Sequence, residues 1–393
     1  MHVVDQIARA CFAALVLAAS CTGGRADDGT SPTVVAAAPV AGPAGRVEET
    51  RELPRFRTDQ GVFRQLRVVY VTRAEGFGLQ RATGLLLLPP GQSDALVVWG
   101  HPTRGLADEC APSLEGAEAV PFAVSMLARG WTVFAPDFPG LGTDAPHPYL
   151  VSSAEGASVL DGAAAARSVA GESLSAAAPT VLWGFSQGGH AVLAAAELAS
   201  RGSGRIAHLA GVLAAAPVAD PLAFARWAMD TPGQLGVLVA ILKGVSTQLA
   251  GAHPDSVFRT SLGVRTSMAE HLCMGELVAK FSSLDRSALR SDPTRVSPWR
   301  EGLLVNRIDG PIDVPVVILQ GTEDPIVSPR IAEKLFARLC RASGSVRLEK
   351  LPGRHDAAGE ATVITALSEL MVRENPSRSA GRTHSSEVAK CEG

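Results

Sequence analysis

Short apolar segments of strand length recur along the chain between about residues 65 and 353, and helix-length segments separate the later ones. Several of the apolar segments lack a polar face, which is typical of strands buried on both sides of a parallel sheet. They are QLRVVYVT, TGLLLLP, ALVVWG, WTVFAPD, TVLWGFS, LAGVLAAAP, VPVVILQG and VRLEKLPG. Apolar residues recur at helical spacing in 118–129, 155–170, 187–200 and 331–340. This alternation predicts an α/β fold in which helices flank a mostly parallel central sheet.

One long interval interrupts the alternation. The chain between Pro221 and Val314 is far longer than a crossover between neighbouring strands requires. Within it, LGVLVAILKGVSTQLAG and SMAEHLCMGELVAKF each predict an apolar helix. We therefore predict a helical cap over 222–310, inserted into a sheet domain formed by 47–221 and 311–372.

The N-terminal residues predict export. The apolar segment from Ala10 to Ala19 is too short to serve as a stable membrane anchor, and small residues follow it, so 1–21 is predicted to be a signal peptide. The sequence LAASC resembles a lipobox, in which Cys21 would carry lipid and attach the protein to a membrane; ordinary cleavage without lipid is the alternative. Residues 22–46 are rich in Gly, Pro and Ala and predict a flexible linker.

Charge and cysteine content exclude some classes of function. The net charge is −3, with 36 basic and 39 acidic residues intermixed, so the chain has no basic region that would bind nucleic acid. The cysteines outside the predicted leader are Cys110, Cys273, Cys340 and Cys391. Export favours disulfides among them, with three pairings open, and their spacing is not that of a zinc site. Residues 373–393 form a polar tail that a disulfide through Cys391 could hold.

The sequence GFSQGGH contains a candidate nucleophile. Gly184, Ser186 and Gly188 satisfy the pattern G-x-S-x-G, with the apolar segment TVLW before it and a helical segment after it. A serine on a sharp turn between strand and helix is the nucleophile elbow, in which the flanking glycines allow close backbone approach. We therefore predict that Ser186 is a nucleophile rather than a serine in an ordinary glycine-rich turn.

An acid and a base follow at the ends of later predicted strands. Asp324 comes after VPVVILQG and His355 after VRLEKLPG, which gives the order Ser, Asp, His. The carboxyl ends of parallel strands share one edge of a sheet, so these groups are expected to meet. Glu323 is the competing acid, expected to face solvent. His190 lies in the predicted elbow helix and is expected to be structural.

Two backbone N–H groups are candidates for binding an oxyanion. One belongs to Gln187, the residue after the nucleophile. The other is expected in the loop after ALVVWG, where Thr103 is the first candidate and Arg104 the second, because Pro102 has no N–H.

A family resemblance rests on three motifs. GHPTRGLADECAPS, FAPDFPGLGTDAPHPYLVSSAEGASVLDGAAAARS and GFSQGGHAVLAA resemble successive motifs of the secretory lipase family, which includes fungal lipases of the A type and bacterial relatives. The resemblance extends from about Arg64 to Met371. It implies an α/β-hydrolase fold with a helical cap after the sixth strand. It also implies a triad of Ser186, Asp324 and His355 and the disulfides Cys110–Cys273 and Cys340–Cys391.

Together these features predict an exported carboxylic-ester hydrolase, a lipase or esterase that acts on a hydrophobic ester through an acyl-enzyme. Such a mechanism needs neither a metal nor an organic cofactor. The alternatives are an acyltransferase or a peptidase that uses the same triad, and a surface binding protein without catalytic activity.

Overall fold

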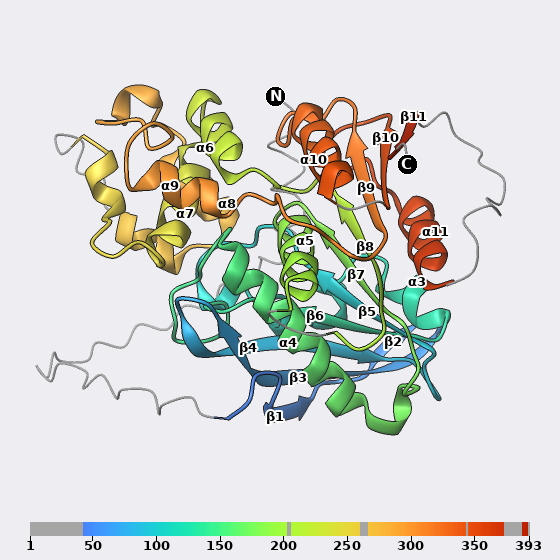
Figure 1. Ribbon diagram of the computed structural model, residues 1–393. Coiled ribbons are helices and arrows are strands. Elements are labelled where there is room, and N and C mark those ends of the chain that lie inside the picture. The colour runs from blue at the N-terminus through green and yellow to red at the C-terminus, as the bar shows by residue number, and fades with distance from the viewer. Residues whose placement is uncertain (1–41, 203–205, 260–265, 343–344, 373–386, 392–393) are drawn as a thin grey trace, which may run out of the picture. The chain divides into compact units, whose positions relative to one another are not determined.

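The computed structural model describes residues 42–202, 206–259, 266–342, 345–372 and 387–391 (Figure 1). The predicted signal peptide with Cys21, most of the predicted linker and most of the polar tail lie outside these residues. Among the helices described, none has both the length and the apolar character that a membrane crossing requires.

A single eleven-stranded sheet forms the centre of the fold. Its strands are β1 (Val47–Glu52), β2 (Phe56–Thr58), β3 (Gly61–Ala74), β4 (Gly78–Leu88), β5 (Ala95–Gly100), β6 (Trp131–Pro136), β7 (Thr180–Phe185), β8 (Leu209–Ala215), β9 (Val316–Gly321), β10 (Val346–Leu351) and β11 (Glu387–Lys390). Every segment predicted as a strand forms one, and β1, β2 and β11 are additional.

The sheet is mixed. Its strand order is β1-β3-β4-β6-β5-β7-β8-β9-β10-β11, and β2 pairs only with β3. Strands β6, β5, β7, β8, β9 and β10 are parallel to one another, whereas β1 to β4 on one side and β11 on the other pair antiparallel with their neighbours. All residues of β5, β6 and β9 are buried, because helices cover both faces of the parallel part.

Helices cover the two faces of the sheet (Figure 1). Helices α4 (Ser152–Ala170), α5 (Gln187–Ser200) and α10 (Pro329–Ala342) share one apolar cluster with the sheet, and α3 (Ala123–Ala128) and α11 (Glu360–Met371) share another with its opposite face. The short helix α2 (Pro112–Glu115) follows the loop after β5. Neighbouring strand residues alternate between the faces: Val98 belongs to the first cluster and Val97 to the second.

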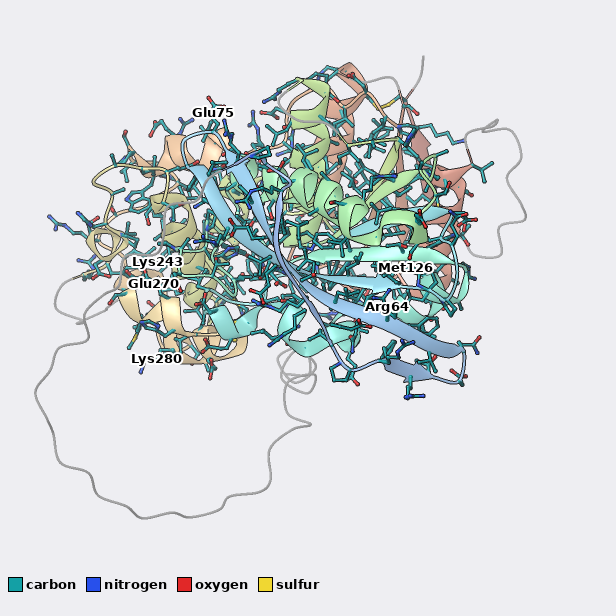
Figure 2. The ribbon with its side chains drawn as sticks, turned by 90° about the horizontal axis from the view of Figure 1, so that it is seen from below. Arg64, Glu75, Met126, Lys243, Glu270 and Lys280 are labelled. Atoms are coloured by element: carbon teal, nitrogen blue, oxygen red, sulfur yellow. A yellow bond between two sulfur atoms is a disulfide. The ribbon has the colours of Figure 1, made fainter. Side chains whose placement is uncertain are left out.

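The interval between β8 and β9 contains helices α6 (Pro221–Asp230), α7 (Leu235–Ser246), α8 (Met274–Phe281) and α9 (Trp299–Val305). These helices pack around α7, of which nearly every residue is buried, in an apolar cluster separate from those of the sheet. At the surface of this cluster, Lys243 of α7 forms an ion pair with Glu270 (Figure 2). The term cap is used below for residues 222–310, the interval in which these helices were predicted.

One predicted helix of the cap is wrong. The segment 267–281 is interrupted at Leu272 and Cys273, between a 3₁₀ helix over Thr266–His271 and α8. Here the chain pairs with the loop after β5, since Leu106 N–H donates to the Leu272 carbonyl and Met274 N–H donates to the Arg104 carbonyl. These backbone hydrogen bonds to a distant segment replace those of a continuous helix.

Two disulfides join distant segments. Cys110 bonds to Cys273, and Cys340 bonds to Cys391, as the family resemblance implied. The first bond connects the loop after β5 to the cap. The second connects α10 to the end of β11, which adds an antiparallel strand beside β10.

Candidate active site

The predicted nucleophile elbow is strained at Ser186. This residue has φ 55° and ψ −113° at the start of α5, a conformation that residues with a side chain rarely adopt. Backbone hydrogen bonds hold it there: its N–H donates to the Ala215 carbonyl, and its carbonyl accepts from the N–H groups of Val218 and His190. The side chain hydroxyl makes no hydrogen bond within the described chain, and the residue is 6% exposed. The hydroxyl is therefore uncommitted.

Glycines make this turn possible. A methyl group on Gly184 would lie 2.1 Å from the Gly188 carbonyl oxygen, and one on Gly188 would lie 1.9 Å from the Gly100 carbonyl oxygen. Both distances are far below van der Waals contact, so no other residue fits without movement of the backbone. Gly188 therefore lies directly against Gly100 at the end of β5, where the predicted oxyanion loop begins.

Asp324 lies in the turn after β9 and has its carboxylate fully engaged. Oδ1 accepts from the N–H groups of Ile326 (2.8 Å) and Val327 (3.0 Å). Oδ2 accepts from Gln320 Nε2 (3.0 Å) and faces His355 Nδ1 at 2.7 Å. These contacts fix the carboxylate and aim one oxygen at the imidazole.

His355 lies in the loop after β10. Because Nδ1 faces a carboxylate oxygen, that nitrogen carries the proton and Nε2 is left with its lone pair, the tautomer that a general base needs. The ring packs against the ring of Phe185, the residue before Ser186, with 4.8 Å between centroids. No hydrogen bond joins Ser186 to His355 among the residues described. The structure thus brings the predicted base to the predicted acid, beside the elbow.

The competing residues lie elsewhere. Glu323 is exposed, and the hydrogen bond it makes is from its backbone N–H to the Gly353 carbonyl. His190 is completely buried, with Nδ1 3.1 Å from Glu155 Oε2 and Nε2 2.8 Å from the Asn306 carbonyl oxygen. Neither residue is placed to act as the acid or base for Ser186.

The two predicted oxyanion donors lie on adjoining segments. Gln187 is the first residue of α5, and an N–H at that position has no intrahelical acceptor. Thr103 lies three residues after Gly100, in the loop that adjoins the elbow. Its hydroxyl is hydrogen bonded to the Tyr149 hydroxyl at 2.8 Å. The loop after β5 is held from the cap side by residues 272–274 and by the disulfide Cys110–Cys273.

The cap also contacts the loop that carries the acid. Trp227 of α6 donates from Nε1 to the carbonyl oxygen of Pro325 at 2.7 Å, one residue after Asp324. Val327 is buried in the apolar cluster of the cap, and Ile326 packs against it. The cap is therefore bonded to the loops on both sides of the elbow.

Sequence reasoning missed a group of buried polar residues beneath the elbow: His147, Tyr149, Glu155 and Asn306. His147, Tyr149 and Glu155 lie in the second of the three family motifs, but nothing in the sequence shows that these side chains are buried together. Asn306 lies in a segment without regular periodicity, where sequence does not reveal contacts.

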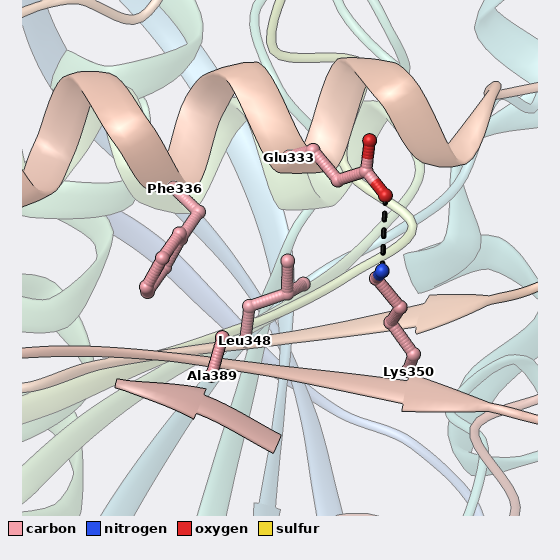
Figure 3. Close-up of a pocket in the computed structure, with 5 residues that line it drawn as sticks. All are labelled: Glu333, Phe336, Leu348, Lys350 and Ala389. Atoms are coloured by element: carbon pink, nitrogen blue, oxygen red, sulfur yellow. Dashed lines mark ion pairs between the residues drawn. The ribbon is translucent and has the colours of Figure 1, made fainter. Parts of the chain in front are cut away.

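A pocket elsewhere on the surface is unrelated to these residues. It is lined by Glu333, Phe336, Leu348, Lys350 and Ala389, between α10 and strands β10 and β11 (Figure 3). An ion pair of 3.0 Å joins Glu333 to Lys350 across it. None of the candidate catalytic residues lines this pocket.

Comparison with a known family agrees with two of the three motifs, since the first motif, 100–113, lies outside the match. The model of the secretory lipase family matches residues 114–287, which include the elbow and much of the cap. The predicted resemblance to the secretory lipases is confirmed. This similarity supports an ester hydrolase as the class of enzyme. No curated protein sequence matches the chain.

Solved structures share the fold. The rice cell wall degrading esterase LipA from Xanthomonas oryzae is 20% identical with a TM-score of 0.68, and the match covers 84% of this chain and 97% of that one. Candida antarctica lipase A in its closed state is 17% identical with a TM-score of 0.66, over 80% of this chain and 78% of that one. The predicted α/β-hydrolase fold is confirmed.

Proposed function

We propose that the protein is an exported serine hydrolase that cleaves carboxylic esters through a triad of Ser186, Asp324 and His355. The observation that carries this proposal is the 2.7 Å contact between His355 Nδ1 and Asp324, beside a serine held in a strained elbow. Two disulfides and the similarity to secretory lipases support export.

The proposed reaction has two steps. His355 Nε2 takes the proton of Ser186 Oγ as that oxygen bonds to the ester carbonyl carbon, and Asp324 stabilises the imidazolium. The carbonyl oxygen becomes an oxyanion, which the N–H of Gln187 and an N–H of the loop at Thr103 bind. The imidazolium protonates the alcohol as the bond to the acyl carbon breaks. Water, deprotonated by His355, then releases the acid and restores Ser186.

The substrate is proposed to be a hydrophobic ester. The lipases and esterases that resemble the chain in fold and family act on esters, and the cap next to the elbow is built around an apolar cluster. Lipid on Cys21 remains a prediction; mass spectrometry of the mature N-terminus would test it.

Hydrolysis of p-nitrophenyl esters of graded chain length by the purified protein tests the function. We expect activity in the wild type and a loss of about 10⁴-fold or more in Ser186→Ala, because removal of a triad member leaves only binding and the oxyanion site. If wild type and Ser186→Ala were equally inactive on every ester, the proposal would fail. An added alcohol distinguishes acyl transfer, which would give a new ester instead of the acid.

A further inference from the structure

A buried polar cluster lies directly beneath the elbow, between α4 and α5, which lie side by side (Figure 1). Its centre is the carboxyl group of Glu155, which is completely buried in the first turn of α4. Oε1 accepts from the Leu150 N–H (2.9 Å) and from Gln187 Nε2 (2.7 Å), and Oε2 faces His190 Nδ1 (3.1 Å). Burial of a carboxyl group is costly unless every oxygen is paired, and here both are.

The side chain of Gln187 is fixed at both amide hydrogens. One is donated to Glu155, and the other to His147 Nε2 at 3.2 Å. His147 Nδ1 donates to the Pro139 carbonyl at 2.7 Å, which leaves Nε2 as an acceptor, and burial lowers the pKa of this histidine. The opposite orientation of the Gln187 amide would set its oxygen against the Glu155 oxygen. The observed orientation avoids this contact between two oxygens, and it leaves Gln187 Oε1 buried without a hydrogen bond to the described residues.

The cluster continues into the cap. His190 Nε2 faces the carbonyl oxygen of Asn306, which can only accept, so this nitrogen carries a hydrogen. Nδ1 of the same ring lies 3.1 Å from Glu155 Oε2. The side chain oxygen of Asn306 accepts from the N–H of Ser152 at the start of α4 (2.9 Å). The residue directly after α9 is thus bonded to both helices beneath the elbow.

We propose that Glu155 is a positioning residue that, through the side chain of Gln187, holds the Gln187 N–H at the place where the oxyanion forms. The role rests on the proposed function. Gln187 is the first residue of α5, where the backbone lacks intrahelical hydrogen bonds from its N–H. The peptide that carries this N–H is held at its other end, where the Ser186 carbonyl accepts from the N–H groups of Val218 and His190. The two contacts of the Gln187 side chain add a second restraint on the same peptide.

The effect is expected in catalysis more than in binding, because the oxyanion exists only after attack. Gln187→Met keeps the backbone N–H and most of the side chain volume but loses both amide contacts. Glu155→Leu removes the acceptor. Displacement of an oxyanion donor costs on the order of 10- to 100-fold, so each variant should lower kcat by about that factor with KM almost unchanged. Both substitutions break the contact between Glu155 and Gln187, so the double variant should be about as active as the less active of the two single variants.

A conservative variant separates hydrogen bonding from charge. In Glu155→Gln the amide oxygen can still accept from Leu150 and Gln187, and the amide nitrogen can donate to a neutral His190. We expect this variant to keep kcat within about 3-fold of wild type, because every contact to Gln187 is retained.

Glu197 provides a matched control on the same helix. It is 5% exposed, and its carboxylate accepts from the backbone N–H of Asp309 (2.8 Å) and of Gly310, far from the elbow end of α5. Glu197→Gln should lower the melting temperature and leave kcat unchanged.

The experiment measures kcat and KM on a p-nitrophenyl ester for the full chain, with active sites counted by titration with a fluorophosphonate. Titration corrects for any variant that folds poorly, and Gln187→Met carries the test if Glu155→Leu gives no folded protein. The affinity for a trifluoromethyl ketone, which forms an oxyanion on Ser186, should fall by the same factor as kcat/KM.

The outcomes are distinct. Reduced kcat per titrated site in Gln187→Met, with full activity in Glu197→Gln, supports the positioning role. Wild-type kcat per site in Gln187→Met would overturn it and leave the proposed function intact. If wild type showed no ester hydrolysis that depends on Ser186, the proposed function would fail and this role with it.

Discussion

The two sides of the candidate site are built by different means. On the elbow side, Ser186 is held by backbone hydrogen bonds and by glycines whose backbones touch, with no space for a methyl group. On the acid–base side, Asp324 and His355 are held by side chain hydrogen bonds, four of which meet at the Asp324 carboxylate. The elbow should therefore be sensitive to volume, and the acid–base side to hydrogen-bonding character.

On the acid–base side the largest effect is expected at Asp324, where volume can be conserved. In Asp324→Asn the amide oxygen must stay at the backbone N–H groups of Ile326 and Val327, which places the amide nitrogen against His355 Nδ1 and favours the wrong imidazole tautomer. We expect kcat for ester hydrolysis to fall about 10⁴-fold. Glu323→Gln, one residue away and exposed, should stay within about 2-fold of wild type, as surface changes usually do. Greater loss in Glu323→Gln than in Asp324→Asn would show that the acid has been misassigned.

On the elbow side, the addition of a single methyl group should be enough to lower activity and stability. Gly188→Ala places Cβ 1.9 Å from the Gly100 carbonyl oxygen, so the backbone of β5 or α5 must move. We expect kcat to fall about 100-fold, as small misplacements at a reacting centre do, and the free energy of unfolding to fall by about 1–3 kcal/mol. Gly275→Ala, in α8 with nothing near its Cβ, is the control and should be neutral or stabilising. Equal behaviour of the two variants in denaturation and activity assays would contradict the steric account of the elbow.

The two disulfides extend the comparison, because one of them holds the loop beside the elbow. Replacing both cysteines of either bond with serine should lower the free energy of unfolding by about 2–5 kcal/mol. Loss of Cys110–Cys273 should also lower kcat, about 10-fold, because residues 104–106 then lose a covalent link to the cap. Loss of Cys340–Cys391 should leave kcat unchanged. Kinetic assays of both double variants, well below their unfolding temperatures, test this difference in kcat between the two disulfides.

A histidine on the elbow side is expected to affect stability alone. Burial lowers the pKa of His101 to about 4, so the folded state favours the neutral ring. The stabilisation that follows is present above pH 6.5, the ordinary pKa, and is lost as the pH falls toward 4. It amounts to about 3 kcal/mol. Denaturant titrations at these pH values should show the loss, and His101→Gln should reduce it. A pH dependence that His101→Gln leaves unchanged would assign the loss to other groups.

The sequence predicted those parts of the site that depend on local pattern or chain order. Gly184, Ser186 and Gly188 form a recognisable motif because the turn itself demands small residues. Asp324 and His355 were predicted to meet because strand ends mark where a doubly wound sheet collects its side chains, and the two side chains lie 2.7 Å apart. Most of the sheet was predicted from the apolar segments, because strands that are buried on both faces consist almost entirely of apolar residues.

The remainder depends on contacts between segments far apart in sequence. The helix predicted over 267–281 is broken because residues 272–274 pair with the loop after β5, a partner that helical periodicity cannot reveal. Strand β11 was missed because it is short, polar and placed by pairing with β10. Glu155 was missed because a single acidic residue in a predicted helix does not indicate whether its side chain is buried.

The attachments of the cap have a consequence for protein engineering. Residues 272–274 hold the loop after β5, Trp227 holds the turn after Asp324, and Asn306 receives the hydrogen bond of His190. A cap transplanted from a relative to change substrate range would bring its own residues to all three junctions. Grafts should therefore preserve these junctions and exchange only what lies between them, because a change at a junction would shift the candidate catalytic residues.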